Sequence, residues 1–275
     1  MNLRTMRRAW VRLRHHLPRG GDSPRFVFHH LPKTGGVSVR RALADWFYRL
    51  PDYRYRVDPD DFESERVTPE PHVVDDIGPW DCLVGHFDEP GIYLHERYPA
   101  VVQSRDFFLF TFVRHPLQLQ LSLYNWEKKK GKDFGIHEVQ EELLKRPNFL
   151  AERIPCGGGD WESVMRRYHY VGTTGDLQGS FDRLGLRLGL PTVVMPHLNQ
   201  SRTRRHLPDF EPGFMAEFER KNQVDFNIYR FALEEWGGEP WTSRPEPGEA
   251  LAPHPVPEGT LGESSSAADE SPART

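Results

Sequence analysis

Residues 25–47 read RFVFHHLPKTGGVSVRRALADWF, and this stretch decides the fold. Its first part, 25–31, is an apolar run with the length and the aromatic content of a buried strand. The run stops at a turn that holds one lysine, Lys33, and two adjacent glycines. A helical pattern over about 36–50 follows at once. The stretch therefore predicts a strand–loop–helix unit, from which α/β folds are built.

The same alternation continues along the chain. Further strands are predicted at 81–87, 107–113 and 168–174, and further helices at about 91–99, 116–130 and 176–190. Residues 51–80 are rich in Pro and Asp and predict loops with short helices. Strands that alternate with helices predict an α/β fold with a mostly parallel central sheet covered on both faces. Ligands of such sheets bind outside the carboxyl ends of the strands, so the loops there are the places to search for a site.

The composition changes near both ends of the chain. We expect a basic N-terminal arm at 1–23, one folded domain at 24–238 and a disordered tail at 239–275, where Pro, Gly, Ser, Ala and Glu dominate. The arm alternates arginines with apolar residues and fits either a short membrane-surface helix or a solvated arm. The arm lacks the apolar core of a secretory signal. The sequence contains no run of about 18 apolar residues, so no transmembrane helix is predicted.

Charge and cysteine content exclude several classes of protein. The formal net charge of −4 over 275 residues does not indicate a nucleic-acid binder, so no nucleic-acid partner is expected. Only two cysteines occur, Cys82 and Cys156, which form neither a disulfide framework nor a zinc-ligand pattern. The histidines match no metal-binding spacing, and we expect no metal site.

The loop LPKTGGVS lies where the first strand ends and the first helix begins. Gly35 and Gly36 allow a ligand to approach the backbone closely. The N–H groups that begin the helix carry its positive dipole end, which favours phosphate or sulfate. Lys33 adds a mobile cation, but it precedes the glycines, unlike the lysine of a Walker A loop, so an ordinary ATPase or GTPase is disfavoured. The candidate anion-binding residues are Lys33, Thr34, Gly35, Gly36, Val37 and Ser38. The alternative is an ordinary strand–turn–helix junction with a solvated lysine.

A second junction of this kind is FFLFTFVRHPLQLQLSLYNW, residues 107–126. Arg114 ends the strand, and Ser122 lies in the helix that follows. An arginine fork and a hydroxyl can hold a phosphate dianion together. Arg114 considered alone fits a structural ion pair equally well. Two such junctions in one sheet favour one ligand that carries two anionic groups.

These motifs resemble those of a known enzyme family. HHLPKTGGVS is similar to the 5′-phosphosulfate loop of sulfotransferases that use 3′-phosphoadenosine 5′-phosphosulfate, and FTFVRHPLQLQLSLY is similar to their 3′-phosphate motif. YVGTTGDLQGSFDRL, PHLNQSR and NQVDFNIYRFAL resemble, in the same order, later blocks of carbohydrate sulfotransferases related to heparan sulfate and uronyl 2-O-sulfotransferases. The resemblance covers roughly residues 25–235. It implies a sulfotransferase domain with a P-loop-like three-layer sandwich fold.

The resemblance also implies roles for individual residues. Residues 34–38 would hold the 5′ end of the donor, and Lys33 would neutralise the oxygen that leaves with adenosine 3′,5′-bisphosphate. Arg114 and Ser122 would bind the 3′-phosphate. Ser201 and Arg202, with Asn199, would belong to a loop that closes over the nucleotide, although the arginines there also fit an anionic saccharide. The reaction requires no metal.

The acceptor hydroxyl needs a general base, and His86 is the candidate. It follows the strand 81–87 on the same edge of the sheet, and the ordinary pKa of histidine suits proton removal at neutral pH. The Gly-His pair resembles the motif that carries the base in the 2-O-sulfotransferases. The alternative is a loop histidine that binds a carbonyl. Asp88 or Glu89 would orient His86, His30 is expected to be structural, and His115 to frame the nucleotide.

The sequence thus predicts an enzyme that transfers a sulfuryl group to a hydroxyl of a saccharide or glycoconjugate. One alternative is a non-catalytic protein on the same scaffold that binds a nucleotide or a sulfated glycan. Another is an unusual nucleotide kinase, which the placement of Lys33 disfavours. Animal members of the family carry an N-terminal membrane anchor, and this chain shows none. A soluble, cytoplasmic enzyme is therefore expected.

Overall fold

The structure of the chain is a computed structural model. It describes Met6 and residues 25–52, 54–56, 65–67, 70–129, 136–154, 160–196 and 210–238. Most of the predicted arm and the whole of the predicted tail lie outside these residues, so the domain boundaries near 24 and 238 remain predictions. No helix within the described part has both the length and the apolar character needed to cross a membrane.

The central sheet is parallel throughout. Its members are β1 (Arg25–His29), β2 (Tyr48–Asp52), β5 (Asp81–Gly85), β6 (Phe107–Val113) and β7 (Tyr170–Thr173). The strands lie in the order β2-β5-β1-β6-β7, and His29 of β1 is paired with Gly85 on one side and Thr111 on the other. From β1 the chain runs to the edge strand β2, returns inward to β5, and only then crosses to β6 and β7 on the other side of β1. The loop after β1 lies at this switch point, where ligands of open α/β sheets bind.

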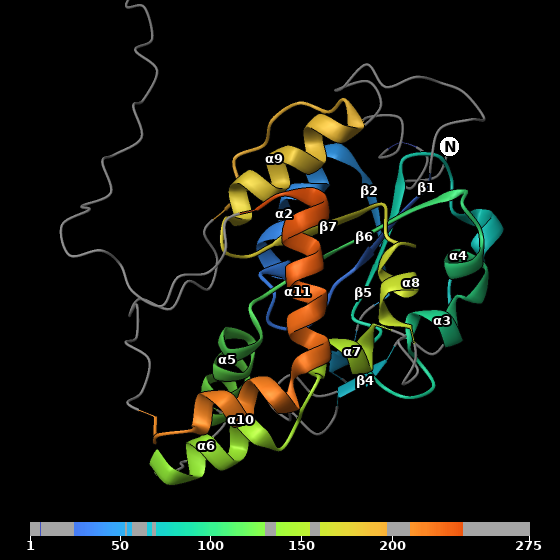
Figure 1. The fold of residues 1–275 in the computed structure, drawn as a ribbon. Coiled ribbons are helices and arrows are strands. Elements are labelled where there is room, and N and C mark those ends of the chain that lie inside the picture. The colour runs from blue at the N-terminus through green and yellow to red at the C-terminus, as the bar shows by residue number, and fades with distance from the viewer. Residues whose placement is uncertain are drawn as a thin grey trace, which may run out of the picture. The chain divides into compact units, whose positions relative to one another are not determined.

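Helices cover both faces of the sheet (Figure 1). On one face, α2 (Gly36–Trp46) and α9 (Leu177–Leu188) pack on Phe26 and Phe28. On the other, Val27 belongs to the core shared with α3 (Leu94–Arg97), α4 (Pro99–Gln103), α8 (Trp161–Met165) and α11 (Gln223–Trp236). A strand buried on both faces reads as a continuous apolar run, as β1 and β6 do. The predicted three-layer α/β fold with a mostly parallel sheet is confirmed.

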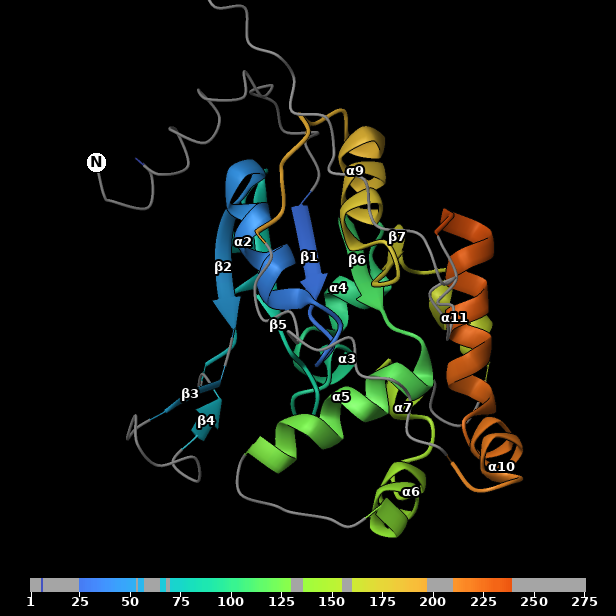
Figure 2. The ribbon, with the colours of Figure 1, turned by 90° about the vertical axis from the view of Figure 1, so that its left-hand side faces the viewer.

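A smaller apolar cluster lies beside the carboxyl end of the sheet. Figure 2 shows α5 (Pro116–Lys129) running across this end, with α6 (Ile136–Leu144) and α10 (Phe214–Lys221) next to it. Leu117, Leu143 and Phe218 join the three helices. The remaining elements are α7 (Phe149–Arg153), the 3-10 helix η2 (Val74–Asp76), and an antiparallel pair formed by β3 (Arg54–Arg56) and β4 (Glu65–Val67).

The helix predicted at 36–50 and the loops predicted from 51 are partly wrong. α2 ends at Trp46, and Phe47 is extended, with φ −128° and ψ 152°. The next residues form β2, which pairs with β5 at the edge of the sheet. Pro51 lies in this strand, and an edge strand tolerates proline because one side of it needs no ladder hydrogen bonds. The helix predicted at 91–99 is replaced by the two short helices α3 and α4.

Candidate active site

The loop after β1 begins the site. Lys33 has φ 64° and Gly35 has φ 75°, so both backbones are left-handed. Glycine adopts this conformation freely, whereas it costs a residue with a Cβ about 1–2 kcal/mol. A lysine held in this region commonly marks a functional site, where neighbouring contacts maintain the strain. The conformation carries the chain directly from β1 into α2.

The first turn of α2 supplies backbone donors. The Ser38 N–H donates to the Gly35 carbonyl at 3.0 Å, so it is engaged within the turn. No described residue accepts a hydrogen bond from the N–H of Gly36 or of Val37. The buried Thr34 hydroxyl donates to the Leu31 carbonyl at 2.8 Å and closes the loop. The donors available to an anion at this helix start are therefore the N–H groups of Gly36 and Val37.

Arg114 joins the second predicted motif to the first. It follows β6, next to β1, and its Nη1 donates to the Lys33 carbonyl at 3.3 Å. Its Nη2 donates to Gln118 Oε1 at 2.9 Å. Burial lowers the pKa of Arg114 from its ordinary value, yet a guanidinium stays charged in proteins. Neither of its two partners within the described residues is a carboxylate, so a half-buried cation lies directly beside the Lys33 loop.

One face of α5 lines this loop. Gln118, Ser122 and Trp126 are spaced by four residues and therefore share a face of the helix. The Lys33 ammonium lies 5.8 Å from the centre of the Trp126 ring. Lys33 thus contacts Arg114 through its carbonyl and Trp126 through its side chain. Ser122 is half-buried between Gln118 and Trp126 on that face.

His86 and His30 are in ring contact. His86 follows β5, and its ring centre lies 4.1 Å from that of His30 in a stacked arrangement. The His30 ring also packs on the start of α2, because a Cβ at Gly36 would lie 1.8 Å from its Cδ2. Burial lowers the pKa of His30 well below 6.5, and His86 and Arg40 act in the same direction. His30 is therefore a neutral spacer between the candidate base and the anion-binding turn.

Two further histidines, at the end of β1 and after β6, contact residues of the core. The buried His29 has its Nδ1 2.8 Å from the Tyr168 hydroxyl, and burial lowers its pKa to about 3 against the opposing charge of Asp88. His115 packs edge-on against Phe226 and Tyr229 of α11, and burial lowers its pKa to about 4. The ring of His115 thus packs on the core helix α11.

The edge strand ends in a closed ion pair. Asp52, the last residue of β2, accepts hydrogen bonds from Arg97 Nε at 2.6 Å and Nη2 at 3.1 Å. The Tyr98 hydroxyl donates to the same carboxylate at 2.6 Å. Asp52 is thus a carboxylate on the ligand-binding edge, both of whose oxygens are engaged by Arg97 and Tyr98. It holds α3 against β2 and is no candidate base.

The other predicted residues fall into two groups. Asn199, Ser201 and Arg202 lie outside the described residues. Asp88 is half-buried and Glu89 exposed, both in the loop that carries His86. Within the described part of the chain, no three His, Cys, Asp or Glu side chains gather in a way that could hold a metal ion.

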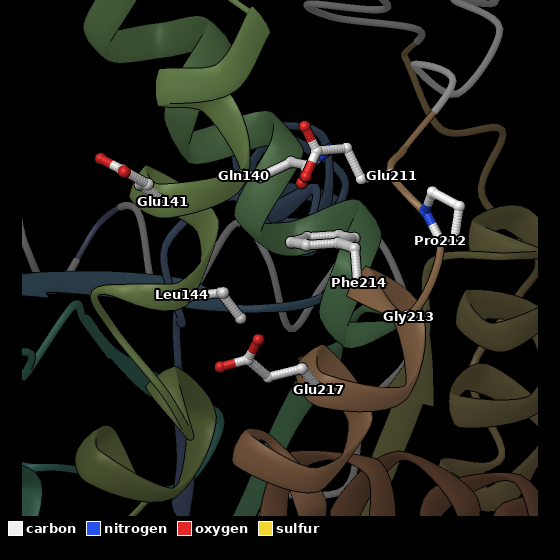
Figure 3. A pocket seen from close by; sticks show the side chains of 8 residues that line it. All are labelled: Gln140, Glu141, Leu144, Glu211, Pro212, Gly213, Phe214 and Glu217. Atoms are coloured by element: carbon white, nitrogen blue, oxygen red, sulfur yellow. The ribbon is translucent and has the colours of Figure 1, made fainter.

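A depression of about 410 Å³ lies elsewhere, between α6 and the start of α10 (Figure 3). Glu141, Glu211 and Glu217 are among its lining residues, and Phe214 contributes an aromatic ring. Three carboxylates repel a ligand with several negative charges. This depression does not suit the doubly anionic ligand that the Lys33 loop and Arg114 favour.

Sequence reasoning missed several residues of the site. Gln118 and Trp126 could have been found, because they lie four residues before and after Ser122 on a predicted helix. Tyr168 could not, since its contact with His29 joins positions 139 residues apart. The stacking of His30 on His86 likewise depends on the pairing of β1 with β5.

Solved structures with a related fold exist. No protein-family model and no curated protein matches the chain. The crystal structure of a sulfotransferase from Alicyclobacillus acidocaldarius matches with a TM-score of 0.42 and 15% sequence identity. The match covers 79% of this chain and 97% of that one. A likeness of this degree assigns neither a ligand nor a reaction, so a functional assignment depends on the residues of the site.

Proposed function

We propose that the protein is a sulfotransferase that moves a sulfuryl group from 3′-phosphoadenosine 5′-phosphosulfate to a hydroxyl of a saccharide or glycoconjugate. One observation carries the proposal: the hydrogen bond from Arg114 to the Lys33 carbonyl, which joins two cationic strand-end loops at the switch point. The resemblance of both loops to the donor-binding motifs of that family supports the same assignment.

The residues present fit a donor with two anionic ends. The N–H groups of Gly36 and Val37, together with Lys33, suit the phosphosulfate. Arg114 and Ser122 suit the 3′-phosphate, since a half-buried guanidinium gains most from a charged acceptor. The hydrogen bond between Arg114 and the Lys33 carbonyl sets the spacing of the two subsites. The donor would therefore bridge the loops that follow β1 and β6.

The chain's own groups can supply the acid–base and electrostatic parts of the reaction. When bound, the donor supplies the sulfuryl group, whose bond to the 5′-phosphate oxygen breaks as the acceptor oxygen bonds to sulfur. His86 accepts the proton of the acceptor hydroxyl. Lys33 stabilises the negative charge that remains on the departing 5′-phosphate oxygen. The products are a sulfate ester, adenosine 3′,5′-bisphosphate and a protonated His86.

The neutral state of His30 assists this chemistry. A charged imidazolium 4.1 Å from His86 would oppose the protonation of His86. Burial keeps His30 uncharged, so the ring orients His86 without competing for a proton. In this proposal His30 is a positioning residue.

Titration calorimetry with two nucleotides tests the donor site. Wild type should bind adenosine 3′,5′-bisphosphate more tightly than adenosine 5′-monophosphate, because only the former reaches Arg114. Arg114→Met should weaken binding of the bisphosphate by about 10- to 100-fold, which corresponds to the loss of a hydrogen bond to a charged group. The affinity for the monophosphate should stay nearly unchanged. The control is Arg187→Met, which removes an exposed arginine of α9. No binding of the bisphosphate, or an equal loss for both nucleotides, would refute the proposal.

A transfer assay separates the enzyme from a non-catalytic binding protein. Labelled donor is incubated with a panel of glycans, and sulfated products are counted. His86→Ala should abolish transfer and keep the affinity for the bisphosphate, because His86 acts on the acceptor. If wild type binds the bisphosphate and sulfates no glycan of the panel, the non-catalytic alternative is favoured.

A further inference from the structure

Trp126 is an aromatic side chain on the site face of α5 that the donor does not account for. The residue is 42% exposed, whereas most large apolar side chains of the described core are buried. Its ring lies 5.8 Å from the Lys33 ammonium. An exposed indole beside the candidate catalytic cation is in a position to contact a molecule bound at the site.

Trp126 lies one turn of α5, about 6 Å along the helix axis, beyond Ser122 of the proposed 3′-phosphate subsite. Gln118, which binds Arg114, is two turns earlier on the same face, or about 12 Å along the helix axis. Ser122 lies between the two. Lys33 contacts residues at both positions, because its carbonyl accepts from Arg114, the partner of Gln118, and its ammonium lies 5.8 Å from the Trp126 ring centre. Trp126 therefore marks the side of Lys33 away from Arg114, where the reacting hydroxyl must come.

The chemistry of the surroundings defines the class of molecule that would stack there. A purely apolar alcohol favours an enclosed apolar pocket, whereas this ring faces water and an ammonium group. A pyranose ring has one face of C–H groups, which carry partial positive charge and pack on the electron-rich face of an indole. Its hydroxyls stay in water or reach the base. Indole faces attract partial positive charge in the same way that they attract cations.

We infer that Trp126 is the acceptor platform, on which a pyranose ring of the substrate stacks while one of its hydroxyls is sulfated. The inference rests on the proposed sulfotransferase function and narrows its acceptor to molecules with an exposed sugar face. Trp126 selects and orients the acceptor, and it takes no part in proton transfer or in donor binding.

Steady-state kinetics of three variants tests the platform. The acceptors are cellotetraose, heparosan tetrasaccharide and, as an aromatic alcohol, 2-naphthol. For whichever tetrasaccharide the wild type sulfates, Trp126→Ala should raise KM by about 3- to 10-fold, the effect of losing one aromatic contact. The kcat should stay within about twofold of wild type. Trp126→Phe keeps a smaller ring, so its KM should lie between those of wild type and Trp126→Ala. The control is Leu186→Ala, which removes an apolar side chain that is 83% exposed on α9 and should change neither constant.

Calorimetry with adenosine 3′,5′-bisphosphate on the same proteins distinguishes the two levels of the hypothesis. Failure of wild type to bind the bisphosphate refutes the sulfotransferase function itself, before any acceptor is added. With donor binding intact, three results overturn the platform alone. These are an unchanged KM in Trp126→Ala, a loss of bisphosphate affinity in that variant, which would show stacking on the purine, and sulfation of 2-naphthol while both tetrasaccharides are inert. Sulfation of none of the three acceptors would instead count against the sulfotransferase function.

Discussion

Two regions of the molecule differ in whether the protein itself accepts hydrogen bonds from the first N–H groups of a helix. At the start of α2, no described residue accepts from the N–H groups of Gly36 and Val37. At the Asn148 junction, formed by Asn148, Asn222 and Asp225, side chains accept from backbone N–H groups at the starts of both α7 and α11. The first region is left ready for a ligand, and the second is closed by the protein itself.

The Asn148 junction is reciprocal. Asp225 of α11 accepts from the N–H groups of Leu150 and Ala151 in α7, each at 2.9 Å. In return, Asn148 Oδ1 accepts from the N–H groups of Val224 and Asp225. Each helix is thus capped by a side chain that precedes or belongs to the other. Polar groups that are buried and mutually satisfied stabilise one arrangement of the chain and offer nothing to a ligand.

The comparison predicts that activity and stability depend on different regions. Removal of a group from the Lys33 loop should cost activity with little loss of stability. Removal of a group from the Asn148 junction should cost stability and leave the activity of the folded fraction intact.

The largest expected effect is at Lys33. Lys33→Ala should lower kcat by about 10²- to 10³-fold, because it removes a charge aimed at the leaving oxygen. Lys33→Gly should be equally inactive but more stable than Lys33→Ala by about 1 kcal/mol, since φ is 64° at this position. Transfer assays and urea unfolding measure the two quantities. Equal stabilities of the two variants would show that the loop stores no strain at Lys33.

The next largest effect is at Asp225. Asp225→Ala should lower the free energy of unfolding by about 3 kcal/mol at pH 5, because two buried N–H groups lose their acceptor. Burial raises the pKa of Asp225 to about 7, so its contribution is complete below the ordinary pKa and declines as pH rises through 7. The loss caused by the substitution should therefore be smaller at pH 8 than at pH 5, by about 2 kcal/mol. Urea unfolding at both pH values is the measurement, with Glu219→Ala, on an exposed position of α10, as the control.

Local patterns predicted the loops of the site because their chemistry is contained in short stretches. Lys33, Gly35 and Gly36 lie within four residues, and the strand before and the helix after them have unmistakable periodicities. β2 was not predictable in this way. Leu43, Trp46 and Leu50 fit helical spacing, and only the pairing with β5 ends the helix and forms a strand.

The relation between distant parts of the site needed the structure. Sequence places His86 on the correct edge of the sheet but not against His30, because that contact depends on the strand register. His115 directly follows Arg114 in sequence, and yet its ring packs on α11. The expected role of His115 beside the nucleotide stays a prediction. The catalytic roles of Lys33 and His86 remain predictions.

The smallest expected effect is at His29, which tests the boundary between the two regions. His29 lies at the ligand-binding edge, where its Nδ1 pairs with the Tyr168 hydroxyl and its buried Nε2 has no hydrogen-bond partner among the described residues. Burial lowers the pKa of His29 to about 3, so the unfolded chain binds its proton first as pH falls below 6.5. Stability from His29 is therefore present near pH 7 and lost on acidification, opposite in sign to Asp225.

The double variant His29→Phe/Tyr168→Phe removes the histidine without leaving the hydroxyl unpaired. Between pH 7 and pH 5 wild type should lose about 2 kcal/mol of unfolding free energy relative to the double variant. His95→Gln, an exposed position of α3, is the matched control and should follow wild type. Parallel stability curves for wild type and the double variant would contradict a buried neutral His29. It would then belong with the ligand-ready groups of the Lys33 loop, because a histidine that can take up a proton without cost must be open to solvent or to a ligand.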